Sequence, residues 1–189
     1  MAQMNYWGEK WDLHVDVCPC DVHINEWIEA TRIAGKTIYH FGTGTHHTVG
    51  QRQAELGNSV FAITASKEEY EAYIELVTQN ARTAKSYVAY FGDIYLTNPA
   101  LLPDFDVVTM VHLCEFSHPN TASAEYGGLT DRQVLDLFTA KTRAGGYIVF
   151  YSRSKDFHVT RPIIESWERE APVKRLADFK TLWIYRKSG

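Results

Sequence analysis

Short apolar runs alternate with longer amphipathic segments along most of the chain. Apolar runs bounded by glycine or polar residues predict strands, and apolar positions three or four residues apart predict helices. Strands are predicted over Thr37–Phe41, Ser59–Ile63, Tyr87–Phe91, Phe105–Val111, Tyr147–Ser152, Val173–Phe179 and Thr181–Arg186. Helices are predicted over His23–Ala34, 46–56, 66–84, 130–143 and 160–170. The alternation favours right-handed crossovers and an α/β three-layer sandwich, whose mostly parallel seven-stranded sheet ends in a C-terminal antiparallel hairpin.

Capping signals mark two of these helices. Ser66 followed by Glu69, and Thr130 followed by Gln133, each match a capping box, in which the two side chains satisfy free amides of the first turn. Pro162 is expected in the first turn of the helix at 160–170, where a missing amide hydrogen costs little.

Composition limits the class of protein. The chain has 189 residues, 45% of them hydrophobic, which suits one globular domain. We expect residues 1–34 to form an N-terminal arm and a capping helix of the same domain as residues 35–189. The formal net charge of −4 argues against nucleic acid as a partner. No run is long enough for a membrane helix, no signal peptide opens the chain, and three cysteines suit a reducing compartment. These features predict a cytoplasmic protein that does not bind membranes.

The strand at 37–41 runs directly into a turn that contains Gly42 and Gly44. Strand, glycine turn and helix together bring backbone amides close to a nucleotide cofactor, because no side chain separates backbone and ligand. His46 or His47 stands where a third glycine of a dinucleotide fingerprint would fall. We favour a position of both imidazole rings on the surface, at the start of the next helix, over contact with a substrate.

Further landmarks follow this turn in a recognisable order. Ala-Ile-Thr-Ala-Ser occupies 62–66 at the end of the second predicted strand, and Gly92-Asp93 follows the third. Phe-Asp-Val-Val at 105–108 opens the fourth strand, and a Gly-Gly pair precedes the fifth. Over roughly Ile33–Lys187 this order resembles the class I S-adenosylmethionine-dependent methyltransferases.

The resemblance implies a Rossmann-like fold, S-adenosylmethionine as cofactor and transferase activity. It also implies a cofactor site built from the turn and the ends of the first four strands. The residues of that implied site are His40, Phe41, Gly42, Thr43, Gly44, Thr64, Ala65, Gly92, Asp93, Ile94 and Val111.

Two positions depart from the family pattern. His40 stands where the first motif has an acidic residue that helps to hold the methionine amino group, and Thr64 stands where a carboxylate binds the ribose hydroxyls. A threonine hydroxyl cannot match charge-assisted hydrogen bonds from a carboxylate. These departures leave three alternatives. The cofactor binds weakly, another residue supplies the missing interactions, or the cofactor is used for chemistry other than methyl transfer.

Histidines follow the fourth predicted strand. His112 is expected at the carboxyl edge of the sheet, where ligands bind in open α/β folds, and His118 lies in the polar loop beyond it. An imidazole can take a proton from a hydroxyl or amine acceptor at neutral pH. We therefore name His112 and His118 as catalytic candidates, against the alternative that His112 only packs at the sheet edge.

A group of potential metal ligands lies around the start of the first predicted helix and consists of His14, Asp16, Cys18, Cys20, Asp21 and His23. Structural zinc sites space cysteines by two to four residues, whereas one residue separates Cys18 from Cys20 and Cys114 is distant. We therefore predict no metal and a loop with buried thiols.

Tyr6, Trp7 and Trp11 form an aromatic N-terminal arm. This arm suits either a lid over the cofactor or packing onto the sheet or onto a homodimer partner.

Taken together, the sequence favours a small methyltransferase acting on a small-molecule acceptor. The alternatives are a non-catalytic or regulatory module that keeps the fold, and an enzyme that uses the same cofactor for another reaction.

Overall fold

The computed structural model describes residues 2–189, which build an α/β fold around a seven-stranded sheet of order β3-β2-β1-β4-β5-β7-β6. Strands β1 to β5 are parallel, while β7 runs antiparallel to both β5 and β6. This confirms the predicted fold class. The strands are β1 Thr37–Phe41, β2 Ser59–Thr64, β3 Tyr87–Phe91, β4 Phe105–Thr109, β5 Thr142–Tyr151, β6 Val173–Arg175 and β7 Leu182–Lys187.

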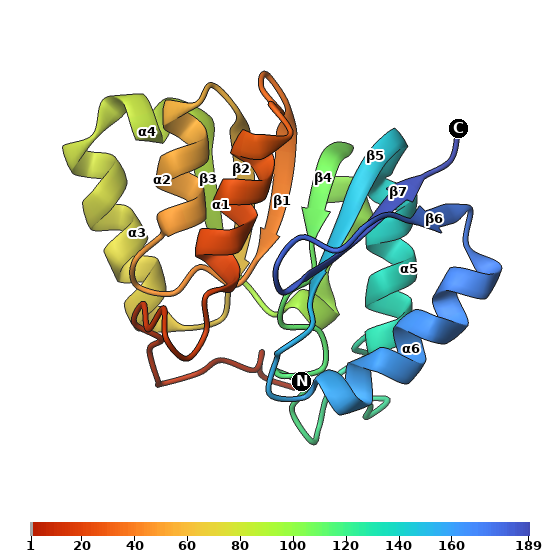
Figure 1. The fold of residues 1–189 in the computed structure, drawn as a ribbon. Helices are drawn as coiled ribbons and strands as arrows, with labels where there is room; N and C mark the ends of the chain where they lie inside the picture. Colours follow the sequence, from red (N-terminus) through yellow and green to blue (C-terminus); the bar gives the residue numbers. More distant parts are fainter. Residues whose placement is uncertain (1) are drawn as a thin grey trace.

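Helices cover both faces of the sheet (Figure 1). They are α1 Cys20–Ala30, α2 Thr48–Glu55, α3 Lys67–Gln79, α4 Ala81–Ser86, α5 Asp131–Lys141 and α6 Phe157–Glu170, with short 3₁₀ turns η1 Ile94–Leu96 and η2 Pro99–Leu101. Helices α1 and α2 bury apolar side chains against one face, and α5 and α6 against the other. Within residues 2–189 no helix is long and apolar enough to cross a membrane.

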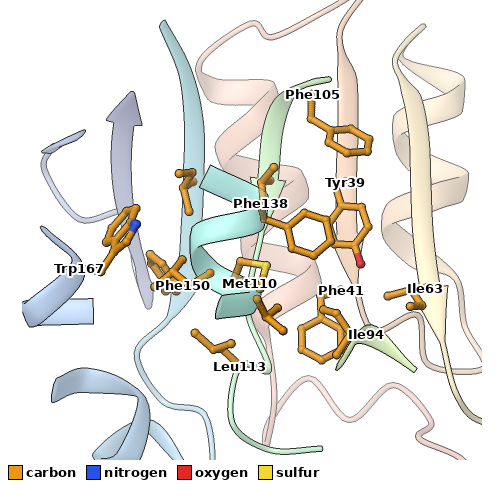
Figure 2. Close-up of a cluster of buried hydrophobic side chains, with 14 of the residues drawn as sticks. Tyr39, Phe41, Ile63, Ile94, Phe105, Met110, Leu113, Phe138, Phe150 and Trp167 are labelled. Atoms are coloured by element: carbon orange, nitrogen blue, oxygen red, sulfur yellow. The ribbon is translucent and has the colours of Figure 1, made fainter. Parts of the chain in front are cut away.

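Alternation along each strand divides the core between the two faces. Tyr39 points toward α5, where its ring lies 4.0 Å from the ring of Phe138, whereas its neighbour Ile38 belongs to the opposite cluster. Figure 2 shows the aromatic side of this core, from Phe105 through Tyr39 to Trp167. The two buried faces hold the parallel strands rigidly, so the loops at their carboxyl ends are set in fixed positions.

The helix predicted over 66–84 is interrupted at Asn80. The Asn80 side chain accepts a hydrogen bond from the amide of Thr83 and thereby caps a second helix, α4. Of the two predicted capping boxes, the one at 130–133 is complete. At Ser66 only the serine half forms, because the carboxylate of Glu69 turns toward the sheet instead.

Other boundaries also differ from the prediction. Strand β4 ends at Thr109 rather than 111, since a turn begins at the next residues. Helix α6 begins at Phe157, so Pro162 lies inside the helix and not in its first turn. The C-terminal hairpin turns at Lys180, whose φ of 53° is left-handed, as predicted for the chain reversal.

Candidate functional site

A cavity of about 220 Å³ lies at the carboxyl ends of the first four strands. In Figure 1 this is the end of the sheet along which the N-terminal segment runs. The turn after β1, the ends of β2 and β3 and the loop after β4 all contribute walls. The implied cofactor residues that line the cavity are Phe41, Gly42, Gly44, Thr64, Ala65, Gly92, Asp93 and Ile94.

The turn after β1 needs both of its glycines. Gly42 and Gly44 have φ values of 87° and 54°, in the left-handed region that glycine tolerates. A Cβ on Gly42 would lie 3.0 Å from the ring of His112, and one on Gly44 would lie 2.3 Å from Nε2 of His46. The turn therefore brings bare backbone to the cavity wall, as the sequence predicted.

A buried carboxylate lies beside the threonine that ends β2. Glu69 is only 3% exposed, and its Oε2 accepts hydrogen bonds from the hydroxyls of Thr64, at 2.6 Å, and Thr43, at 3.0 Å. Burial raises the pKa of Glu69, and the two hydroxyl donors partly oppose that shift. A carboxylate thus lines the cavity near the end of β2, although it comes from the first turn of α3.

A second buried carboxylate lies beside His40. Asp21 of α1 places its two oxygens 3.6 Å from Nε2 of His40 and 3.7 Å from Nε2 of His46. Burial by itself would raise the pKa of Asp21, but the adjacent histidines, His40 foremost, lower it overall. Asp21 lines the cavity, whereas His40 lies behind it with Nδ1 hydrogen-bonded to the hydroxyl of Thr109.

His112 lies just past the end of β4 and lines the same cavity. Its Nδ1 is 3.1 Å from Oε2 of Glu115, whose other oxygen accepts a hydrogen bond from Ser154. Burial by itself would lower the pKa of His112, but the hydrogen bond and charge of Glu115 raise it overall. The Nε2 atom is directed toward Cys20, with 3.8 Å between nitrogen and sulfur.

Two thiols also line the cavity. The sulfurs of Cys18 and Cys20 lie 3.4 Å apart, and all three cysteines of the chain are free. The hydrogen bond between these sulfurs lowers the pKa of Cys18 to about 6. The sequence predicted a loop with buried thiols before a helix starting at His23, but α1 begins at Cys20, and only Cys20 of the pair is fully buried.

The N-terminal arm covers the cavity. The rings of Trp7 and Trp11 pack edge-on against Phe116, with centroids 5.7 and 5.1 Å from it, and all three residues line the cavity. The amide of Trp7 donates to the carbonyl of Ala65, and the carbonyl of Trp11 accepts from Thr45. These bonds tie the arm to the ends of β1 and β2.

Some predicted site residues lie away from the cavity wall. Thr43 and Val111 are buried, and His118 is exposed with its ring hydrogen-bonded to Asn120. His47 is 2% exposed, which corrects the prediction of a surface ring. Its nitrogens contact the hydroxyl of Tyr87 and the carbonyl of Glu69, and burial lowers its pKa to about 4.

The sequence did not identify Asp21 or Glu69 as cavity residues. Glu69 was interpreted only as a helix cap, and Asp21 only as one member of a group of potential ligands. A signal existed for Glu69, because it follows Thr64 by five residues and lies in the first turn of the helix after β2. No sequence signal joined Asp21 to His40, since only the packing of α1 brings them together.

No protein-family model matches the chain, and no curated protein matches its sequence. Solved structures do resemble it. One is the N-methyltransferase NodS from Bradyrhizobium japonicum WM9 with S-adenosyl-L-homocysteine, at 11% identity over 89% of this chain and 87% of that chain, with a TM-score of 0.64.

Two further similar structures carry different assignments. A protein from Methanococcus maripaludis assigned as an S-adenosyl-L-methionine-dependent methyltransferase has 14% identity, coverage of 91% and 86%, and a TM-score of 0.58. One from Clostridium thermocellum assigned as an rRNA methylase has 12% identity, coverage of 88% and 96%, and a TM-score of 0.59. At such identities the likeness concerns the fold. The chain has the Rossmann-like fold of the class I S-adenosylmethionine-dependent methyltransferases.

Proposed function

We propose that this protein is an S-adenosylmethionine-dependent methyltransferase whose acceptor is a small molecule. The observation that carries the proposal is the pair of buried carboxylates, Asp21 and Glu69, that line the cavity beside His40 and Thr64. The family pattern has its acidic residues at those two positions, and here α1 and α3 supply carboxylates beside them. The same pair argues against a module that has lost its cofactor.

The cofactor would lie along the carboxyl edge of the sheet. Its methionine portion would follow the glycine turn at 42–44, with Asp21 near the amino group. Its ribose hydroxyls would bind Glu69, and its adenine would lie against Gly92 and Ile94. The carboxylate of Asp93 already accepts hydrogen bonds from the hydroxyl of Tyr126 and the side-chain amide of Asn5, so it would act by holding this wall in place.

The acceptor would lie between this cofactor and the loop after β4. His112, hydrogen-bonded to Glu115, is the group there that can help to remove a proton from an acceptor. The acceptor's nucleophilic atom then attacks the methyl carbon, and the carbon–sulfur bond of the sulfonium breaks to release the neutral thioether. The covering arm and the formal charge of −4 support a small acceptor over a nucleic acid.

The decisive test is calorimetry with S-adenosylmethionine and S-adenosylhomocysteine on the wild-type chain, followed by mass spectrometry of reactions with small acceptors. Saturable binding of both cofactor forms and a product heavier by one methylene unit support the proposal. Absence of binding contradicts it, and a product carrying a different group would indicate other chemistry of the same cofactor.

A further inference from the structure

Three soft or borderline metal ligands meet at one point of the cavity wall. Cys18 precedes α1 and Cys20 begins it, whereas His112 follows β4, 92 positions after Cys20. One donor atom from each lies within 4.8 Å of the other two. The sulfurs are 3.4 Å apart, and Nε2 of His112 is 3.8 Å from the sulfur of Cys20.

These separations suit a zinc ion. Tetrahedral Zn²⁺ has bonds of about 2.3 Å to sulfur and about 2.0–2.1 Å to nitrogen, which places its ligand atoms roughly 3.5–3.8 Å apart. The two measured pairs are close to that range. The remaining pair of donor atoms, in Cys18 and His112, lies within 4.8 Å, and zinc binding would bring these two atoms closer together. Cys18 is half-buried in the segment just before α1.

The orientation of His112 gives an independent reason. Its Nδ1 lies 3.1 Å from a carboxylate oxygen of Glu115, so in the neutral ring the proton is assigned to that nitrogen, and the lone pair of Nε2 is then directed toward the thiols. A metal-ligating histidine almost always donates its other N–H to a carboxylate, carbonyl or water, which sets the tautomer. The hydroxyl of Ser154 in turn donates a hydrogen bond to Glu115, which fixes the orientation of Glu115 and, through it, that of His112.

We propose that Cys18, Cys20 and His112 bind a zinc ion through two sulfurs and one imidazole nitrogen, with a fourth coordination position open to the cavity. Asp21 is adjacent, with one oxygen 3.4 Å from the sulfur of Cys20, but its two oxygens also lie near His40 and His46, so it is not counted among the ligands. Three protein ligands and one open position are typical of catalytic zinc sites, whereas structural sites use four.

The open position would bind the donor atom of the acceptor, an assignment that rests on the proposed function. A thiol acceptor loses its proton to solvent on binding, because zinc favours the thiolate. Its sulfur then forms a bond to the methyl carbon as the sulfonium carbon–sulfur bond breaks, giving a thioether product and S-adenosylhomocysteine. With zinc bound, His112 is a ligand of the metal and does not remove the proton of the acceptor.

Cobalt substitution tests the site without any cofactor. The full-length protein, reduced and freed of metal with a chelator, is titrated with Co²⁺ and then with Zn²⁺. We expect one Co²⁺ per chain, a sulfur-to-cobalt charge-transfer band, and loss of that band on adding Zn²⁺. Cys18→Ser should lower the band by about half, because one of two thiolates is lost, whereas Cys114→Ser should match wild type.

Two further measurements test the role of Glu115 and the open coordination position. Glu115→Gln should weaken Zn²⁺ binding about 10- to 100-fold, as expected for loss of the carboxylate behind a ligand. A small thiol added to the cobalt-loaded protein should increase the charge-transfer band through the open position. No band, or equal bands in wild type and Cys18→Ser, would overturn the metal site, and no response to the thiol would overturn the open position. Cofactor binding is measured separately, so these outcomes remain distinct from failure of the proposed function.

Discussion

The hydroxyl of Thr64 donates a 2.6 Å hydrogen bond to the carboxylate of Glu69. Thr64 ends β2, at the place where the resemblance implies an acidic ribose ligand, and Glu69 lies in the first turn of the helix that follows. The negative charge missing from the strand is therefore present at the same edge of the cavity. Thr43 also donates to this carboxylate, so two hydroxyls orient it.

Glu69→Gln should weaken cofactor binding at least about tenfold, because a charge-assisted hydrogen bond to a ribose hydroxyl is worth about 1.5–3 kcal/mol. Calorimetry with S-adenosylhomocysteine measures the change. Glu68→Gln, an exposed neighbour in the same helical turn, is the matched control and should bind as wild type. Equal affinity in both variants would show that the ribose is held elsewhere.

Thr64→Asp should weaken cofactor binding and lower the thermal midpoint, although the family pattern has an acidic residue at this position. The new carboxylate would lie against that of Glu69, and two buried carboxylates this close cannot both stay ionised. The double variant Thr64→Asp with Glu69→Gln should recover much of the loss. Tighter binding in the single variant would contradict the role assigned to Glu69.

His47 should make the protein sensitive to acid. Its pKa is about 4 in the folded protein against 6.5 for the free side chain, so between these values the unfolded chain binds more protons. The free energy of unfolding should therefore fall as the pH drops from 6.5 toward 4, by about 3 kcal/mol from this residue. Urea unfolding across that pH range should show a smaller loss for His47→Gln.

His158→Gln provides the comparison, since it removes an exposed imidazole and leaves the buried ring of His47 in place. A His47→Gln protein that loses stability as steeply as wild type would mean that other groups cause the acid sensitivity.

Local patterns predicted the strands and the glycine turn well, because both depend on residues close together in the chain. The site depends instead on packing between distant segments. Asp21 reaches His40 only when α1 lies against the sheet, and His112 reaches Cys20 only when the loop after β4 folds back. A cysteine spacing that argued against zinc could not reveal a ligand 92 positions away.

The break at Asn80 shows a different limit. Helical periodicity continued through 66–84, but an asparagine side chain that can bond the amide of Thr83 competes with the helix and starts a new one. Which of the two forms also depends on tertiary structure, because the chain must enter the sheet as β3 at Tyr87.

Trp11 should act as part of a lid. Its ring packs 5.1 Å from that of Phe116 over the cavity, and its carbonyl ties the arm to Thr45. Trp11→Ala should raise the dissociation rate of the cofactor about fivefold or more, as expected when a packed aromatic of this kind is lost, while changing the thermal midpoint little. Stopped-flow fluorescence with a labelled cofactor analogue measures the rate.

The arm contains its own control. Tyr6 is exposed and lies over Lys67 outside the cavity wall, so Tyr6→Ala should leave cofactor dissociation unchanged. An unchanged rate in Trp11→Ala would mean that the arm packs on the sheet without retaining the cofactor.

His112 should matter for turnover more than for cofactor binding, because it lies where the transferred group meets its acceptor. His112→Ala should leave the cofactor dissociation constant within about threefold and lower the rate at least about tenfold, whether the ring carries a proton or holds a metal. His118→Ala tests the other sequence candidate, and its exposed ring predicts no change in either quantity. If His112→Ala binds the cofactor poorly but turns over normally at saturation, the residue is a binding group and the acceptor lies elsewhere.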